Sequence, residues 1–226
     1  MKISTIIVLI GLAAASATLA SAGFKLKRDY DQKNIKEYLS YTHLPPFHHI
    51  KDDYNSKQPW EWYICDVKPS SSCGVGIRYY SGKLLAFNVK NDTLFITKQE
   101  TASINDIAYG LPVTINCNQL RSVTSGVANI NLTACSADSL TVFATKKSNV
   151  LLNRLKTNYL KIGAGNTSNI TIAETDSLRE AAVSLSGHSC LTINNTILGK
   201  RNLSIGDSAS LRLSGKSLDN FNIPRR

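Results

Sequence analysis

The sequence predicts an all-β fold, a parallel β-helix (solenoid) of stacked strands with an aromatic-rich cap at its N-terminal end. Two interleaved series of apolar pairs favour this prediction. One series recurs with an almost constant spacing, at Ile130/Leu132, Val150/Leu152, Ile170/Ile172, Leu191/Ile193 and Leu211/Leu213. The other series recurs between them and has one longer step, at Leu140/Val142, Leu160/Ile162, Val183/Leu185 and Leu203/Ile205. Such a fixed period, here about 20 residues, is typical of repeats that bury their apolar faces only by stacking on one another.

Each period therefore contains two strands and two turns. Strand pairing would place successive turns of the coil ~4.8 Å apart, so that each series forms an inward aliphatic column. Gly and Asn between the strands supply the left-handed conformations that tight turns need. The three extra residues in the longer step of the second series fit a loop near residues 176–181. An antiparallel sandwich with evenly spaced strands is the alternative, although it has no reason to hold the spacing so constant.

This interpretation divides the chain into three parts: 1–22, a signal peptide; 23–82, a linker with capping strands; and 83–226, the β-helix domain. Fourteen of the 17 aromatic residues precede residue 110, which suits a cap over the open end of the coil. The expected strands of the cap lie at 47–50, 60–67 and 76–80. Strands 84–89 and 93–97 are expected next, as a hairpin or as the first turn of the coil, and 113–117 with 119–123 opens the regular body.

Residues 1–22 have the pattern of an exported protein. Lys2 precedes an apolar run, 3–12, and the segment ends with Ala20-Ser21-Ala22, the small-residue pattern of a cleavage site. Residues 3–24 are also long enough to span a bilayer, so a retained membrane anchor is the alternative to cleavage. We expect an exported protein that lies in the periplasm, at the cell surface or in the medium, with or without this tether.

The formal net charge of +10 comes from basic residues that are scattered along the chain. A nucleic-acid binder would be expected to have a basic stripe and a reading element, and neither is apparent. We therefore expect no nucleic-acid partner, but weak attraction to acidic polymers or anionic envelope surfaces. The sequence does not indicate an oligomeric state.

Five cysteines lie in the part that would be exported, where disulfides can form. Cys65 and Cys73 could close a tight loop. Cys117 and Cys135 are separated by nearly one period and could lie on adjacent turns of the coil, although counting by twos from residue 113 places Cys117 inward and Cys135 outward. Cys190 is expected to be a free thiol.

The histidines do not suggest a metal site. His43, His48 and His49 are close in sequence, but adjacent residues in a strand face opposite sides, which is poor for joint ligation by His48 and His49. We therefore expect packed or solvated histidines, and no metal or cofactor.

Catalytic residues are not apparent either. The acids of the body include Asp138, Asp176 and Asp207, each of which precedes a Ser in a turn, where Asp ordinarily caps the backbone. Beyond Tyr109 only Phe143, Tyr159 and Phe221 are aromatic, so a stacking platform for sugar rings is not expected. A nucleophile would also need a positioned base and an oxyanion hole, and we expect no enzyme.

Strand motifs follow one another in a set order and period over roughly residues 84–220: Asp92-Thr93-Leu94-Phe95-Ile96, Val113-Thr114-Ile115, Leu120-Arg121-Ser122-Val123, Ala182-Val183-Ser184-Leu185-Ser186-Gly187 and Asn202-Leu203-Ser204-Ile205-Gly206. In this order and period the chain resembles the auto-transporter adhesin head GIN domain family, found chiefly in Bacteroidota. The resemblance implies a right-handed parallel β-helix outside the inner membrane, and it supplies no catalytic residues.

These observations favour a non-catalytic envelope or surface protein, an adhesin-like scaffold with weak multivalent contacts to envelope polymers or surface proteins. The alternatives are a β-helix lyase or hydrolase that acts on carbohydrate, and a membrane-tethered regulatory binding module.

Asp followed by a hydroxyl residue and a small or aliphatic residue also resembles the O-glycosylation sequon of the same phylum. It occurs at Thr93, Ser139, Ser177 and Ser208, although turns favour Asp-Ser for their own reasons.

Overall fold

The computed structural model describes residues 39–52, 63–78, 85–98, 111–175 and 177–221, with isolated helical residues at 16, 18, 21, 23–25 and 27. The chain divides into two compact units, 1–39 and 40–226, and the strands described below belong to the second, apart from the first residue of the first strand, Leu39. Most of the expected signal peptide lies outside the described residues. In the parts of the chain that are described, no helix has the length and apolar character of a membrane span.

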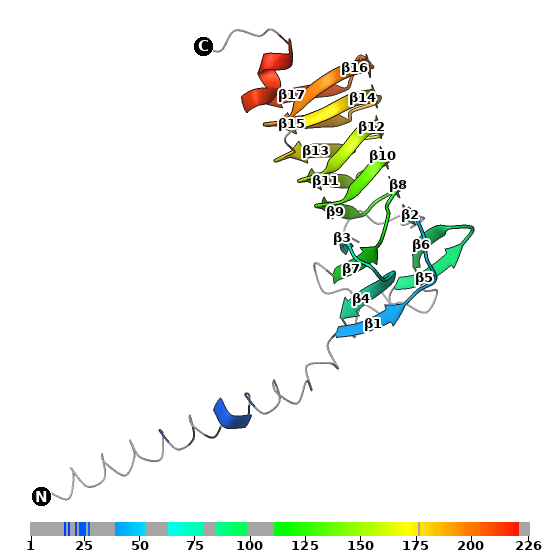
Figure 1. The fold of residues 1–226 in the computed structure, drawn as a ribbon, viewed down its shortest axis with the longest axis vertical. Helices are drawn as coiled ribbons and strands as arrows, with labels where there is room; N and C mark the ends of the chain where they lie inside the picture. The colour runs from blue at the N-terminus through cyan, green and yellow to red at the C-terminus, as the bar shows by residue number, and fades with distance from the viewer. Residues whose placement is uncertain are drawn as a thin grey trace, which may run out of the picture. The chain divides into compact units, whose positions relative to one another are not determined.

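Five consecutive turns of a coil, from β8(Ser122–Ser125) to β17(Ser210–Ser214), form the body of the second unit, and they can be followed in Figure 1. Each turn contributes one strand to an eight-stranded sheet and one to a nine-stranded sheet, and successive turns pair in parallel. The strand pairs are β8(Ser122–Ser125)/β9(Asn129–Thr133), β10(Ser136–Ala144)/β11(Asn149–Asn153), β12(Lys156–Ala164)/β13(Asn169–Ala173), β14(Ser177–Leu185)/β15(Cys190–Asn194) and β16(Ile197–Ile205)/β17(Ser210–Ser214). The predicted solenoid is thereby confirmed, and the antiparallel sandwich is not formed.

Aliphatic columns fill the space between the two sheets. In the nine-stranded sheet the register aligns Ile130, Val150, Ile170 and Leu191, all of them buried. In the eight-stranded sheet it aligns a second set of buried residues, Val123, Val142, Ile162 and Val183. Period-2 alternation places the residues between these positions on the outer faces.

The second series of apolar pairs has a different register from the expected one. Ile162 pairs with Val183, and Leu160 pairs with Ala181, so the step between these turns is longer than the others by one residue and not by three. The expected register differs because Ala164 and Ala181 occupy buried core positions. The spacing of large aliphatic residues alone does not indicate these two positions. The one extra residue lies in the expected region, between Thr175 and Leu178.

The N-terminal strands contribute a turn to the coil out of sequence order. β2(His49–Asp52) lies between β6(Thr93–Lys98) and β8, and β3(Tyr63–Pro69) lies between β7(Leu111–Cys117) and β9. All four pairings are parallel. We call β2 and β3 the inserted turn, because it separates β6 and β7 from the five consecutive turns that follow them in sequence.

Asp52 fastens the inserted turn to its neighbour. Its side chain is 3 % exposed and stands in the inward column beside Ile96. The Oδ2 atom accepts hydrogen bonds from the backbone N–H groups of Gly126, Val127 and Ala128 at 2.9 to 3.1 Å. A buried carboxylate is tolerated when several donors satisfy it, so this residue replaces an aliphatic side chain without leaving polar atoms unpaired.

Antiparallel strands cap the N-terminal end of the coil. β4(Gly74–Arg78) pairs antiparallel with β7 and lies beside β1(Leu39–His43), while β5(Leu85–Lys90) pairs antiparallel with β6. The predicted hairpin is therefore confirmed, and its turn residues Asn91 and Asp92 have φ angles of 49° and 61°. At the other end a 3-10 helix, η4(Gly215–Phe221), contacts β15, β16 and β17.

Left-handed residues recur at one corner of the coil. Ala134, Arg154, Glu174, Asn195 and Gly215 have φ angles between 52° and 62° and follow β9, β11, β13, β15 and β17 in turn. Only the last is glycine, and a Cβ there would meet the side chain of Asn195.

Buried serines also recur from turn to turn. The hydroxyls of Ser148, Ser168 and Ser189 donate hydrogen bonds to carbonyls of the preceding turn.

Candidate binding surface

The outer face of the eight-stranded sheet is the candidate binding surface. The pairing registers align Phe95, Lys51, Thr124, Phe143 and Gly163 in one outward column across five adjacent strands. This column crosses the inserted turn, so residues from distant parts of the sequence meet on one face.

Two aromatic rings on this face each lie beside a lysine. The Lys51 Nζ atom is 5.8 Å from the centroid of the Phe95 ring, and the Lys161 Nζ atom is 6.0 Å from that of Phe143. Phe143 is 38 % exposed. Its ring lies against Gly163, where an added Cβ would clash with the ring atoms. The absence of a side chain at Gly163 therefore allows the ring to lie on the sheet.

One hollow includes Thr124 and Phe143 of this column, and a second hollow shares the residues Ser136, Ala137 and Asp138 with it. The one of about 790 Å³ includes His49, Arg121 and Phe143 in its lining. The other, of about 840 Å³, includes Arg154, Lys156 and Glu174. Both are open and carry hydroxyl, amide and charged groups, which suits contact with an extended polar ligand more than enclosure of a small molecule.

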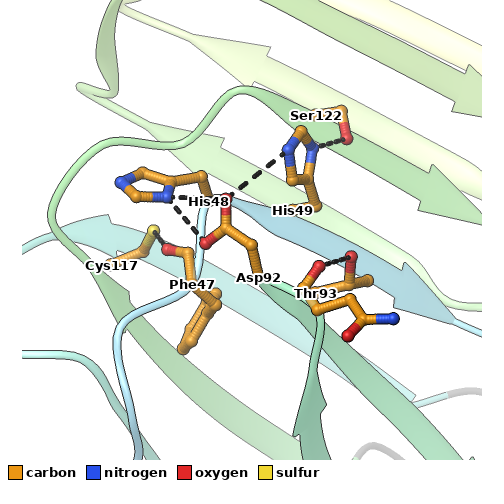
Figure 2. A network of polar contacts seen from close by, with 8 residues as sticks. Phe47, His48, His49, Asp92, Thr93, Cys117 and Ser122 are labelled. Carbon is orange, nitrogen blue, oxygen red and sulfur yellow. Dashed lines mark hydrogen bonds and ion pairs between the residues drawn. The ribbon is translucent and has the colours of Figure 1, made fainter.

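A cluster of polar side chains fixes the hairpin turn to the rest of the surface (Figure 2). The His48 Nδ1 atom is 2.7 and 2.9 Å from the two carboxylate oxygens of Asp92. The His49 Nδ1 atom is 2.6 Å from Ser122 Oγ, and its Nε2 atom is 3.9 Å from Asp92 Oδ2. Both histidines approach the same carboxylate, and His48 precedes β2, so the alternation expected for two adjacent strand residues does not apply to this pair.

Asp92 has a pKa below its usual value. Desolvation raises the pKa of this carboxyl, but the hydrogen bond with His48 and the positive charges of His48 and His49 outweigh it and lower the pKa overall. The carboxylate is therefore the form that this cluster favours.

The atoms of Ser122, His49 and Asp92 follow the order of a hydrolase triad without its geometry. Catalysis would require the base and its orienting carboxylate to be about 2.6–3.2 Å apart, whereas His49 Nε2 and Asp92 Oδ2 are separated by 3.9 Å. The carboxylate instead contacts His48. The arrangement is that of a structural link between the β5–β6 hairpin, β2 and β8.

Of the other acids in the body of the coil, Asp138 lines the same hollow as His49 and Ser122 of this cluster. Asp138 and Glu174 share the larger hollow with Arg154 and Lys156, and the Asp138 Oδ1 atom accepts a hydrogen bond from Asn158 Nδ2 at 2.7 Å. Asp207 is exposed in the turn after β16. Asp176 lies outside the described residues. The sequence did not predict that Phe95 and Phe143 share one column, because Phe95 belongs to the hairpin and only the inserted turn aligns it with Phe143.

The cysteine pairs suggested by sequence are not neighbours in the sheets. β7 lies between β4, which follows Cys73, and β3, which contains Cys65. β3 in turn separates the strand of Cys117 from β9, just before Cys135. Cys117 faces inward as expected. Cys135 is also buried, contrary to expectation, because the left-handed Ala134 ends the alternation before it. Cys190 is partly buried.

The suggested glycosylation sites differ in accessibility. Ser139 and Ser208 are exposed, whereas Thr93 is partly buried and its hydroxyl donates to the Asn91 carbonyl at 3.3 Å. The side chain of Ser177 lies outside what the structure describes. O-glycosylation at all four sites stays a prediction, which intact-mass measurement of native material tests.

No family model matches the chain, and no curated protein sequence matches it either. Its fold is similar to that of solved structures, each of which aligns with 78 % of this chain. A candidate adhesin from Bacteroides fragilis is 14 % identical, with 96 % of its own chain covered and a TM-score of 0.46. A candidate adhesin from Parabacteroides merdae is 12 % identical, with 95 % covered and a TM-score of 0.47. A candidate lipid-binding protein from Parabacteroides distasonis is 9 % identical, with 96 % covered and a TM-score of 0.42.

Proposed function

We propose that this chain is an exported, non-catalytic envelope or surface protein of adhesin type, whose coil binds extended acidic polymers weakly and at several points. The observation that carries the proposal is the row of lysine-flanked aromatic rings, Lys51 with Phe95 and Lys161 with Phe143, on the outer face of the eight-stranded sheet. Membership of the head GIN family is part of this proposal, as is a location outside the inner membrane.

The repeat of the coil supports multivalent contact. Equivalent outward positions recur every ~4.8 Å along the axis, and on this face they carry hydroxyls, amides and cations from successive turns, including Ser122, Thr124, Thr141 and Lys161. Individually weak contacts to repeating units of one polymer add through a high effective concentration. Aromatic rings beside cations offer both an apolar face and a charge to an acidic sugar.

Binding of polygalacturonate, a linear acidic glycan, tests this surface. We expect weak binding by calorimetry that declines steeply as added salt screens the exposed charges. Replacing both Lys51 and Lys161 by Gln should weaken it several-fold. Arg212→Gln is the matched control, because Arg212 lies in the outward column of the nine-stranded sheet and its loss should leave the affinity nearly unchanged. Tight binding to a neutral glycan that ignores salt would contradict the proposal.

The same polymer also tests the absence of catalysis. We expect neither reducing ends nor unsaturated sugars to be released, with or without Ca²⁺. Release by the unmodified protein that disappears in Asp138→Asn or Glu174→Gln would show instead that the larger hollow is the active site of a carbohydrate enzyme.

The location and the tether are tested on native material. N-terminal sequencing of the protein from membrane and soluble fractions should find a chain that begins after Ala22 if the signal peptide is cleaved. A chain that retains residues 3–24 and stays with the membrane would favour the tethered binding module.

A further inference from the structure

Cys73 and Cys117 lie opposite one another at the N-terminal cap. β4 pairs antiparallel with β7, with Gly74 opposite Asn116 and Val75 opposite Ile115. Continuing this register by one residue places Cys73 directly across from Cys117. Directly opposite residues of an antiparallel pair have Cβ atoms ~4.5–5.5 Å apart, close to the separation that a disulfide needs. Cys73 also packs against the core to which Cys117 belongs.

The other thiols are poorer partners for either residue. A strand of the nine-stranded sheet separates Cys117 from Cys135, and another separates Cys73 from Cys65. Two strand spacings are ~9.5 Å, which exceeds the ~7 Å limit between the Cα atoms of a disulfide. Cys190 is in β15, several turns further along the coil.

The two thiols also differ in accessibility, which sets the order in which they would react. Cys117 is 3 % exposed, and its Sγ atom is 3.2 Å from the carbonyl oxygen of Phe47. Burial, followed by the neighbouring Cys73, raises the pKa of Cys117 to about 12. Cys73 is only partly buried, so a disulfide in solution reaches it first.

We propose that Cys73 and Cys117 form a cross-strand disulfide that fastens the capping strand β4 to β7. The thiolate of Cys73 attacks one sulfur of a small-molecule or protein disulfide and releases one thiol. Cys117, after losing its proton to solvent, then attacks the Cys73 sulfur of the mixed disulfide and releases the second thiol. Two protein thiols are oxidised, and one donor disulfide is reduced to two thiols.

This bond would act on the cap of the coil. It would close a loop that contains β4, the β5–β6 hairpin and nearly all of β7. The covalent bond would keep β4 beside β7 even when the hydrogen bonds between the two strands open. Loops of this length stabilise mainly by restricting the unfolded chain. The inference is independent of the polymer-binding proposal, because it concerns thiols on the nine-stranded sheet.

Peptide mapping of the folded full chain after exposure to oxidised glutathione tests the bond. Combined cleavage after Lys or Arg and before Asp separates all five cysteines, and it should give a linked species of residues 66–78 with 106–121, which reduction abolishes. Three free thiols should remain of the five. Five free thiols in folded protein, or a different linked pair such as Cys117 with Cys135, would overturn the proposal.

Variants test the consequence for stability. Oxidation should raise the Tm of the unmodified protein by about 10 °C. Cys73→Ala should abolish this rise, and Cys190→Ala should retain it. Cys73 is partly exposed, so its replacement should not prevent folding. A rise of the same size in Cys73→Ala would show that the bond is not responsible.

Discussion

Single carboxylates hold the parts of this molecule together at two places. Asp52 binds three backbone amides of the adjacent turn, and Asp92 binds the histidine that precedes β2. Both link segments that are far apart in sequence. They differ in setting, because Asp52 is buried whereas Asp92 is partly exposed.

Asp92 should make the stability of the protein sensitive to acid. Its pKa is lower in the folded state, so its contribution is complete above the unfolded pKa of about 3.9 and is lost as the pH falls through the lower folded value. Urea denaturation between about pH 2 and 6 should show a smaller loss of stability in Asp92→Asn than in the unmodified protein. Asp207→Asn, at an exposed turn, is the control. Equal acid sensitivity in all three proteins would contradict this assignment.

The inward columns predict opposite outcomes for two adjacent residues. Ile170 is fully buried, whereas Thr171 lies on the outer face. Ile170→Asp places an unpaired charge in an apolar core and should cost well over ~3 kcal/mol of the free energy of unfolding. Thr171→Asp should cost much less. Chemical denaturation measures both, and equal losses would be incompatible with the inward register.

Several turn residues adopt backbone conformations that their residue types do not predict. Ala134, Arg154 and Glu174 adopt left-handed φ angles that favour glycine. They do so because the period of the coil requires the same corner in each turn, and the hydrogen bonds of the flanking strands outweigh the local cost.

Lys146 and Lys147 form a matched pair for measuring that cost. Both are exposed in the turn after β10, but only Lys146 has a positive φ, 55°. Lys146→Gly should raise the free energy of unfolding by roughly 0.5–1 kcal/mol, because glycine accepts this conformation without strain. Lys147→Gly should lower it, because it adds freedom only to the unfolded chain. Thermal and chemical denaturation of the two variants distinguish these effects, and a loss in both would mean that the turn is not strained at Lys146.

The sequence was sufficient to predict elements whose pattern is local. The spacing of aliphatic pairs indicated the coil and its inward columns, and Asn91-Asp92 between two apolar runs indicated the hairpin. It could not predict that Ala164 and Ala181 take core positions, because alanine has too little apolar character to stand out. Nor could it predict that His48 and His49 both approach Asp92, since that depends on which strands are neighbours.

In the molecule as a whole, the position of the inserted turn does not follow from any local pattern in the sequence. Of the strands in residues 23–82, where a cap was expected, β1 and β4 lie at one end of the nine-stranded sheet, whereas β2 and β3 lie inside the sheets. No local pattern distinguishes a strand at the edge of a sheet from one placed between two others. The sequence does not predict the binding surface for the same reason. The outward column of that surface includes Lys51, and Lys51 belongs to the inserted turn.

The inserted turn has a consequence for the order in which the protein can assemble. A chain that emerges from a ribosome or an export channel presents β2 and β3 first, but their partners β8 and β9 end only at Thr133. Until that residue emerges, both strands have unpaired edges, which are prone to associate with other chains. Assembly cannot therefore follow the order of synthesis. β2 and β3 are made early, but their partners β8 and β9 are complete only when Thr133 has been made.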